Sequence, residues 1–204
     1  MITEIVEANP LLVEYCKKVE ESIYLSRISI EDFSKNDEWH YVQSDLNKNI
    51  FLLKRLDEKG LLSNNLDLCD CGIGFGTILY DLYLQSKEFN NTTFKFTGVE
   101  KYDTYIDSFN TNLKSYWNDE LNIVHDDVMN HDYSNHNFIW FYSPFKKSDK
   151  MMSFIDKVIT EAPIGAMIFG LDTFRVMEYG SEDLKNKFKL LKMVDLDGLY
   201  FFIK

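Results

Sequence analysis

Apolar residues recur at helical spacing over the first sixty positions of the chain. They follow steps of three and four residues, as in an amphipathic helix that buries one face. The positions that carry this pattern are Ile5, Leu12, Tyr15, Val19 and Ile23, and then Ile50, Leu53 and Leu56. Between the two sets, Ser34–Ser44 is a polar loop with the aromatic residues Trp39 and Tyr41. We therefore expect a helical cap over residues 1–65 that belongs to the same domain as the rest.

From residue 66 onward, short apolar runs alternate with helical segments. The expected strands are Leu66–Cys71, Thr93–Val99, Leu121–Val124, Phe138–Tyr142, Ala166–Phe169, Lys189–Val194 and Leu199–Ile203. The expected helices are Thr77–Ser86, Asp103–Trp117 and Asp149–Glu161. Strands that alternate with helices predict right-handed βαβ units. The sequence therefore predicts an α/β domain over residues 66–204, a three-layer sandwich with helices on both faces of a mostly parallel sheet.

The last two expected strands are joined by a short turn. Only Asp195-Leu196-Asp197-Gly198 separates them, and an Asp-Gly pair between two apolar runs is typical of a β-hairpin. We therefore expect the sheet to end in an antiparallel pair. The chain has no internal repeat and no Pro- or Gly-rich linker, so a single domain is expected.

The amino-acid composition excludes a disordered chain, and the net charge indicates which kind of binding partner the protein suits. Among 204 residues, 45% are hydrophobic and 15% are aromatic, which is enough to form a packed core. The net charge is −11, and all of it arises in residues 1–144, which hold 12 Lys+Arg against 24 Asp+Glu. An acidic surface repels phosphate backbones, which disfavours free nucleic acid. It suits a basic protein partner better.

Neither export nor membrane insertion is indicated by the sequence. Acidic residues and no Lys or Arg precede Tyr15, which is the wrong flank for a signal peptide, and no apolar run reaches the roughly 20 residues of a membrane span. The cysteines Cys16, Cys69 and Cys71 are odd in number, and two of them lie two positions apart in an expected strand. A disulfide framework is therefore not expected, and we predict a reduced, cytoplasmic setting.

The most informative segment runs from the first expected strand through three alternating glycines into a helix. Gly72, Gly74 and Gly76 permit a sharp turn and let a ligand lie against bare backbone at a helix N-terminus. The dinucleotide pattern G-x-G-x-x-G would need a glycine where Thr77 stands. Asp70, just before the turn, would repel a pyrophosphate but not a cationic ligand. The segment therefore departs from that of nicotinamide-dependent oxidoreductases.

This segment resembles the first motif, D-x-G-x-G-x-G, of the class I, seven-strand S-adenosylmethionine-dependent methyltransferases. Asp70, Gly72, Gly74 and Gly76 match it position for position. The resemblance implies a seven-stranded sheet and S-adenosyl-L-methionine as cofactor. It also implies that Glu100, at the end of the second strand, binds the ribose hydroxyls. Further cofactor contacts carried over in this way are Lys101 and Tyr102 after Glu100, Asp127 with its neighbour Asp126 after the third strand, and Tyr142 after the fourth.

The same resemblance places the acceptor site at Tyr142-Ser143-Pro144-Phe145. This segment is similar to the (D/N/S)-P-P-(Y/F) loop of amino-group methyltransferases but lacks one proline. In that family, the first residue and a loop carbonyl bind the target nitrogen, and the aromatic ring stacks on the base. We therefore take these four residues as the candidate catalytic residues.

A second partial match lies before the glycine motif. Tyr41 and Ser44 precede a helix that leads into the motif, a layout similar to seven-strand protein-lysine methyltransferases, in which this loop closes over the cofactor. The resemblance implies that both residues contact the cofactor. The alternative is that Trp39 and Tyr41 only anchor the cap to the core.

Three histidines lie close together in sequence but match no tight ligand motif. His125, His131 and His136 alternate with aspartates in a segment that a polar loop explains equally well. We therefore expect no metal site. For Cys69 and Cys71, which share the strand face opposite Asp70, we expect buried free thiols.

The expected function is methyl transfer from S-adenosyl-L-methionine to an amino or hydroxyl acceptor, and protein lysine is one acceptor that the sequence suggests. The alternative is a cofactor-binding pseudo-enzyme, or a partner subunit of a nucleic-acid-modifying complex. The incomplete acceptor loop and the net charge of −11 are consistent with that alternative.

Overall fold

The computed structural model describes residues 9–25, 51–196 and 198–204, and they form one seven-stranded sheet with helices on both faces. The strands are β1 (Asn65–Cys71), β2 (Thr93–Glu100), β3 (Leu121–His125), β4 (Phe138–Phe141), β5 (Met167–Gly170), β6 (Lys192–Leu196) and β7 (Leu199–Ile203). Their order is β3-β2-β1-β4-β5-β7-β6. β1 to β5 pair in parallel, whereas β7 is antiparallel to β5 and β6. The predicted α/β fold with a terminal hairpin is confirmed.

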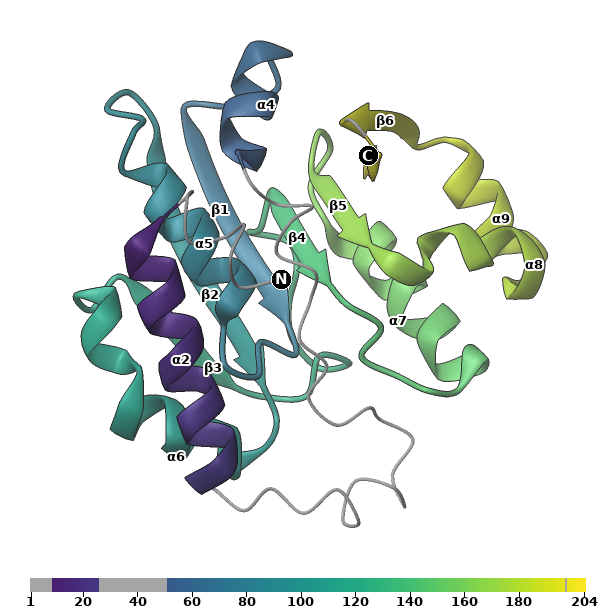
Figure 1. The fold of residues 1–204 in the computed structure, drawn as a ribbon. Coiled ribbons are helices and arrows are strands. Elements are labelled where there is room, and N and C mark those ends of the chain that lie inside the picture. Colours follow the sequence, from purple (N-terminus) through teal and green to yellow (C-terminus); the bar gives the residue numbers. More distant parts are fainter. Residues whose placement is uncertain (1–8, 26–50, 197) are drawn as a thin grey trace.

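Two groups of helices cover the sheet. Figure 1 shows α2 (Pro10–Leu25), α5 (Thr77–Ser86) and α6 (Asp103–Asn112) on one side of the strands. On the other side lie α7 (Ser148–Glu161), α8 (Val176–Tyr179) and α9 (Glu182–Lys189) (Figure 1). The remaining described helices are α4 (Leu52–Glu58) and the 3-10 turns Lys114–Trp117 and Leu171–Arg175.

β1, an inner strand that pairs with β2 and β4, is buried on both faces, as expected in a parallel sheet. Leu66 and Leu68 belong to the hydrophobic core on the side of α5. Cys69 and Cys71 belong to the separate core on the side of α7. Because successive side chains of a strand point to opposite faces, β1 contributes to both cores at once.

The described part of the N-terminal cap shares the first core. Leu12 and Tyr15 of α2 and Leu53 of α4 are at most 2% exposed and pack in the cluster that contains Leu66 of β1. The boundary at residue 65 stays a prediction, because the segments 1–8 and 26–50 lie outside the described residues.

Two of the expected elements differ from the observed bounds by more than one residue at an end. α6 ends at Asn112, and the rest of the expected helix is a 3-10 turn that ends at Trp117. The expected strand Lys189–Val194 begins only at Lys192, because α9 occupies the preceding segment. Ser181 caps α9 by accepting a hydrogen bond from the Leu184 N–H at 3.2 Å, a signal typical of a helix start.

The connection from β3 to β4 contains neither a helix nor a strand. Residues 126–137 cross the face of the sheet that α7 covers, and Tyr133 from this connection is fully buried in the second core. The Tyr133 hydroxyl donates a hydrogen bond to the Val128 carbonyl at 2.8 Å. This connection takes the place of the helix that usually joins two parallel strands.

All three cysteines are free thiols, and Cys69 and Cys71 are buried. Within the described ranges, no helix has the length and apolar character needed to cross a membrane.

Tyr15 connects the cap to the glycine loop, and its hydroxyl can be tested on its own. It donates to the Phe75 carbonyl at 2.6 Å and accepts from Trp117 Nε1 at 3.3 Å, and both contacts are buried. We expect Tyr15→Phe to lower the free energy of unfolding by about 1–2 kcal/mol, the loss typical of a buried hydrogen bond. Urea denaturation followed by fluorescence would measure this change.

Tyr116→Phe is the matched control, because the Tyr116 hydroxyl bonds to Glu14 in an exposed position. We expect it to change stability by less than about 0.5 kcal/mol. Equal effects of the two substitutions would contradict the role given to the Tyr15 hydroxyl.

Candidate functional site

The glycine loop lies between the end of β1 and the start of α5. Gly72, Gly74 and Gly76 have φ values of 78°, 54° and 68°, all in the left-handed region that favours glycine. The chain therefore makes a tight turn that side chains at these three positions would strain. This conformation explains in physical terms why glycines alternate here.

The loop is held against β2 by backbone hydrogen bonds. The N–H groups of Gly72 and Ile73 both donate to the Val99 carbonyl, at 2.9 and 3.0 Å. Gly98 allows this contact, because a Cβ there would lie 2.1 Å from the Ile73 Cδ1. Sequence reasoning assigned no role to Gly98, since only the packing of Ile73 over β2 reveals one.

The carboxylate of Glu100 joins the glycine loop to the loop after β2. One of its oxygens accepts the Gly74 N–H at 2.9 Å. The other accepts the N–H groups of Lys101 at 2.9 Å and Tyr102 at 3.0 Å. Glu100 is only 6% exposed. The structure thus brings together four residues that the sequence predicted for one site.

Asp70 lies at the end of β1 and is 7% exposed. Burial, together with the nearby charge of Glu100, raises the pKa of Asp70 to about 7. Two carboxyl groups therefore share one edge of the sheet, and one of them is partly protonated at neutral pH. Such a pair favours a positively charged ligand over an anionic one.

Asp126 and Asp127 follow β3 and reach the same edge. The Asp126 N–H donates to the Glu100 carbonyl at 3.0 Å. The Asp127 carboxylate accepts the Met129 N–H at 3.0 Å and pairs with the Lys101 ammonium at 3.0 Å. Burial acts to raise the pKa of Asp127, but these contacts outweigh it and the pKa is lowered. Asp127 is therefore an ionised residue beside the loop after β2.

The predicted acceptor loop after β4 faces the glycine loop. A Cβ built on Gly72 would lie 4.0 Å from the Pro144 Cβ, which is its nearest neighbour. Tyr142 is 37% exposed, and Ser143 has a φ of 47°, in the left-handed region. The two loops flank the point between β1 and β4 where the strand order reverses, which is where parallel sheets bind ligands.

Phe145 does not lie with the rest of this loop. It is 3% exposed and packs edge-to-face on Phe154 of α7, with ring centroids 5.8 Å apart. Its ring is thus part of the second core and not open to a ligand. This position corrects the expectation that Phe145 stacks on the acceptor.

Trp140 is a candidate that sequence reasoning missed. It is paired in register with Asp70 across β1 and β4, and its indole N–H is buried without a partner among the described residues. A buried donor of this kind is costly unless a ligand or water accepts its hydrogen bond. The expected strand contained Trp140, but no pattern in the sequence shows whether an indole N–H is paired.

Tyr41 and Ser44, the two further cofactor contacts predicted from the sequence, lie outside the described residues. Their assignment stays a prediction.

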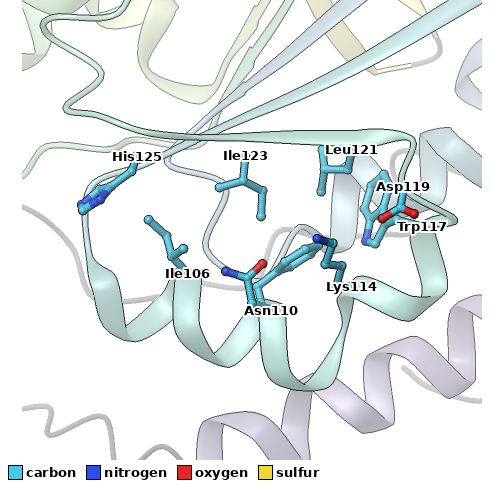
Figure 2. Close-up of a pocket in the computed structure, with 9 residues that line it drawn as sticks. Ile106, Asn110, Lys114, Trp117, Asp119, Leu121, Ile123 and His125 are labelled. Carbon is cyan, nitrogen blue, oxygen red and sulfur yellow. The ribbon is translucent and has the colours of Figure 1, made fainter.

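A pocket of about 190 Å³ lies between α6 and β3, at the far edge of the sheet. Figure 2 shows side chains from both elements pointing into it, with His125 at one end. The glycine loop contributes nothing to its lining. We therefore do not assign the candidate site to this pocket.

The sequence matches no known family model and no curated protein. Solved structures do match the fold. A protein from Listeria monocytogenes described as a class I S-adenosylmethionine-dependent methyltransferase is similar over 91% of this chain and 67% of that one, with a TM-score of 0.58 and 12% identity. Precorrin-6y C5,15-methyltransferase from Geobacter metallireducens is similar over 84% of this chain and 94% of that one, with a TM-score of 0.50 and 13% identity. The chain has the class I methyltransferase fold.

The buried carboxyl of Asp70 predicts a specific pH dependence of stability. Its pKa is about 7 in the folded protein against an ordinary value of 3.8. Between these values the folded chain keeps a proton that the unfolded chain has lost, so stability falls as the pH rises from about 4 to about 7. We expect Asp70→Asn to raise the free energy of unfolding at pH 8 by about 1–3 kcal/mol. Urea denaturation from pH 5 to pH 8 measures it.

Asp81 retains part of this pH dependence in the variant, because burial raises its pKa to about 7 as well. Asp107→Asn makes the same chemical change on the exposed side of α6 and is the control. If the Asp70→Asn variant and this control show the same dependence of unfolding free energy on pH, the Asp70 carboxyl is not the source of the predicted pH dependence.

Proposed function

We propose that the protein is a methyltransferase that takes its methyl group from S-adenosyl-L-methionine. The observation that carries the proposal is the Glu100 carboxylate, which holds the left-handed glycine loop and the loop after β2 in one preformed edge. The class I fold supports it, because the edge lies at the carboxyl ends of β1 and β2, where such sheets bind ligands.

The residues present fit this cofactor. Gly72 presents backbone without a side chain towards Pro144, so a ligand at this edge can approach the main chain of the glycine loop directly. Asp70 and Glu100 provide negative charge for a cofactor that carries a sulfonium and an ammonium group. In this proposal Glu100 also accepts from the ribose hydroxyls, and Asp127 lies on the adenine side.

The chemistry asks little of the protein beyond positioning. The acceptor's lone pair forms a bond to the methyl carbon while the bond from that carbon to sulfur breaks. The electron pair of the broken bond remains on sulfur, which becomes a neutral thioether. An amine acceptor then loses one proton. Holding both reactants at attack distance and excluding water can supply about 7–11 kcal/mol of the barrier. Tyr142, Ser143 and Pro144 are the residues we assign to positioning the acceptor.

We propose an amine on a basic protein, a lysine side chain, as the acceptor. The charge of the first 144 residues, 12 Lys+Arg against 24 Asp+Glu, attracts a basic partner. The buried ring of Phe145 removes the base-stacking contact that a nucleic-acid amino acceptor would use. Free nucleic acid is therefore the less favoured acceptor in this proposal.

Gly72→Ala tests the cofactor site. The methyl group would enter the space facing Pro144, and we expect binding of S-adenosylhomocysteine to weaken at least about tenfold, or 1.4 kcal/mol. Isothermal titration calorimetry with the full chain measures the affinity.

Gly60→Ala is the matched control. Gly60 has a φ of 66° and nothing within 4 Å of a built Cβ, so the substitution imposes a similar backbone strain of about 1–2 kcal/mol away from the site. We expect it to leave binding unchanged. Failure of the wild-type chain to bind S-adenosylhomocysteine would overturn the proposed function.

Tyr142→Ala tests the acceptor site. We expect methyl transfer at saturating S-adenosyl-L-methionine to fall about tenfold or more, a larger loss than any weakening of S-adenosylhomocysteine binding, because Tyr142 is assigned to the acceptor as well as to the cofactor. The assay is radiolabelled methyl transfer into fractionated lysate treated with nuclease or with protease. Label that survives nuclease and is lost with protease supports a protein acceptor, whereas the reverse result contradicts it. Cofactor binding without transfer to any fraction would favour a pseudo-enzyme.

A further inference from the structure

Two histidines and a cysteine meet where residues 126–137 cross β1, on the face of the sheet away from α5. Cys69 is 0% exposed and His136 is 7% exposed, while His131 is half-buried. The Nε2 atoms of the two histidines are 3.0 Å apart. The Cys69 sulfur and one nitrogen of each histidine all lie within 4.8 Å of one another.

A carboxylate orients one of the histidines. Asp67 of β1 accepts a hydrogen bond from His136 Nδ1 at 2.7 Å. With its proton on Nδ1, His136 directs the Nε2 lone pair towards the cluster. Metal-binding histidines are usually oriented in this way, by a carboxylate or carbonyl on the other ring nitrogen.

The three ligand atoms are of the kind that zinc prefers. A thiolate and two imidazole nitrogens bind Zn²⁺ at about 2.3 Å and about 2.0–2.1 Å, which in a tetrahedral site separates two nitrogens by about 3.4 Å. The observed 3.0 Å between the Nε2 atoms needs only a small opening of the pair. We propose that Cys69, His131 and His136 bind a zinc ion, with Asp67 orienting His136 and a water as fourth ligand.

The protons balance without a further reactant. The Cys69 thiol releases its proton to solvent when the thiolate binds the metal. His131, which donates from Nε2 to His136 Nε2 in the metal-free pair, carries its proton on Nδ1 once its Nε2 binds zinc. Both histidines stay neutral.

The location gives this site a structural role. The connection from β3 to β4 is twelve residues long and has no helix or strand of its own. The Tyr133 hydroxyl bonds within the connection, and the Tyr133 N–H donates to Glu161 of α7 at 3.2 Å. A metal held by His131, His136 and Cys69 would tie the connection to β1.

The spacing of the histidines did not predict this site, because the cysteine comes from a different element. Cys69 lies 62 positions before His131 along the chain. Sequence reasoning grouped the histidines with neighbouring aspartates instead. The structure joins His136 to Asp67, a residue on β1.

The test is titration of the reduced, metal-free full chain with Zn²⁺ and with Co²⁺. We expect one equivalent of metal per chain and, for Co²⁺, a thiolate-to-metal charge-transfer band in the near ultraviolet. Cys69→Ala should remove that band, and His136→Ala should weaken binding about tenfold or more. Hydrogen exchange over residues 126–137 should slow when zinc is added to the wild-type chain.

Two matched controls separate this site from general effects on folding. Cys71→Ala makes the same change two residues further along β1, on the same face of the strand. His125→Ala removes a histidine that bonds to the Lys101 carbonyl and lies outside the cluster. Both should bind one equivalent with the charge-transfer band intact. The proposal is overturned if the wild-type chain binds no stoichiometric metal, or if the band persists in Cys69→Ala.

Discussion

The carboxylate of Glu100 accepts hydrogen bonds from three backbone N–H groups that belong to two different loops. Glu100 follows Val99, whose carbonyl accepts two more N–H groups from the glycine loop. Because Val99 is paired with Cys71 at the end of β1, the register of the two strands places the carboxylate where the loop turns back. The left-handed glycines give the loop its shape, and Glu100 fixes its position relative to β2. The chain's own hydrogen bonds thus preform the candidate ligand edge, and preformed sites bind with a lower ordering cost.

This arrangement has an electrostatic consequence. Burial, together with the neighbouring charge of Glu100, raises the pKa of Asp70 to about 7, so Asp70 is partly neutral at neutral pH. A cation at this edge would remove that penalty by favouring the ionised form. Trp140, which pairs with Asp70 in register, keeps a buried indole N–H without a partner among the described residues. The carboxyl groups at the edge therefore suit a cation.

The sequence predicted those helices and strands in which the buried residues recur at regular helical or strand spacing. Helix α5 has the expected bounds, and the motif residues from Asp70 to Gly76 form the predicted turn. Periodicity did not reveal the end of α6, because Phe109, Leu113 and Trp117 are all buried and four-residue steps suit both an α-helix and a following 3-10 turn. The burial of Phe145 also escaped prediction, since an aromatic residue after a strand can face either a ligand or a neighbouring helix. Contacts between distant elements, such as His136 with Asp67, leave no local signal.

The polar cluster at Cys69 follows from the absence of a helix between β3 and β4. A helix in this position would cover β1 with one apolar stripe and satisfy its own backbone. The connection 126–137 instead supplies Val128 and Tyr133 to the second core and brings His131 and His136 in with them. Buried polar groups need hydrogen-bond partners. Here the Tyr133 hydroxyl bonds to the Val128 carbonyl, the two histidines bond to each other, and His136 also bonds to Asp67. Cys69, His131 and His136 therefore lie in an otherwise apolar core, at the place where a helix between β3 and β4 would normally cover β1. A metal bound there would hold the irregular connection against the strand.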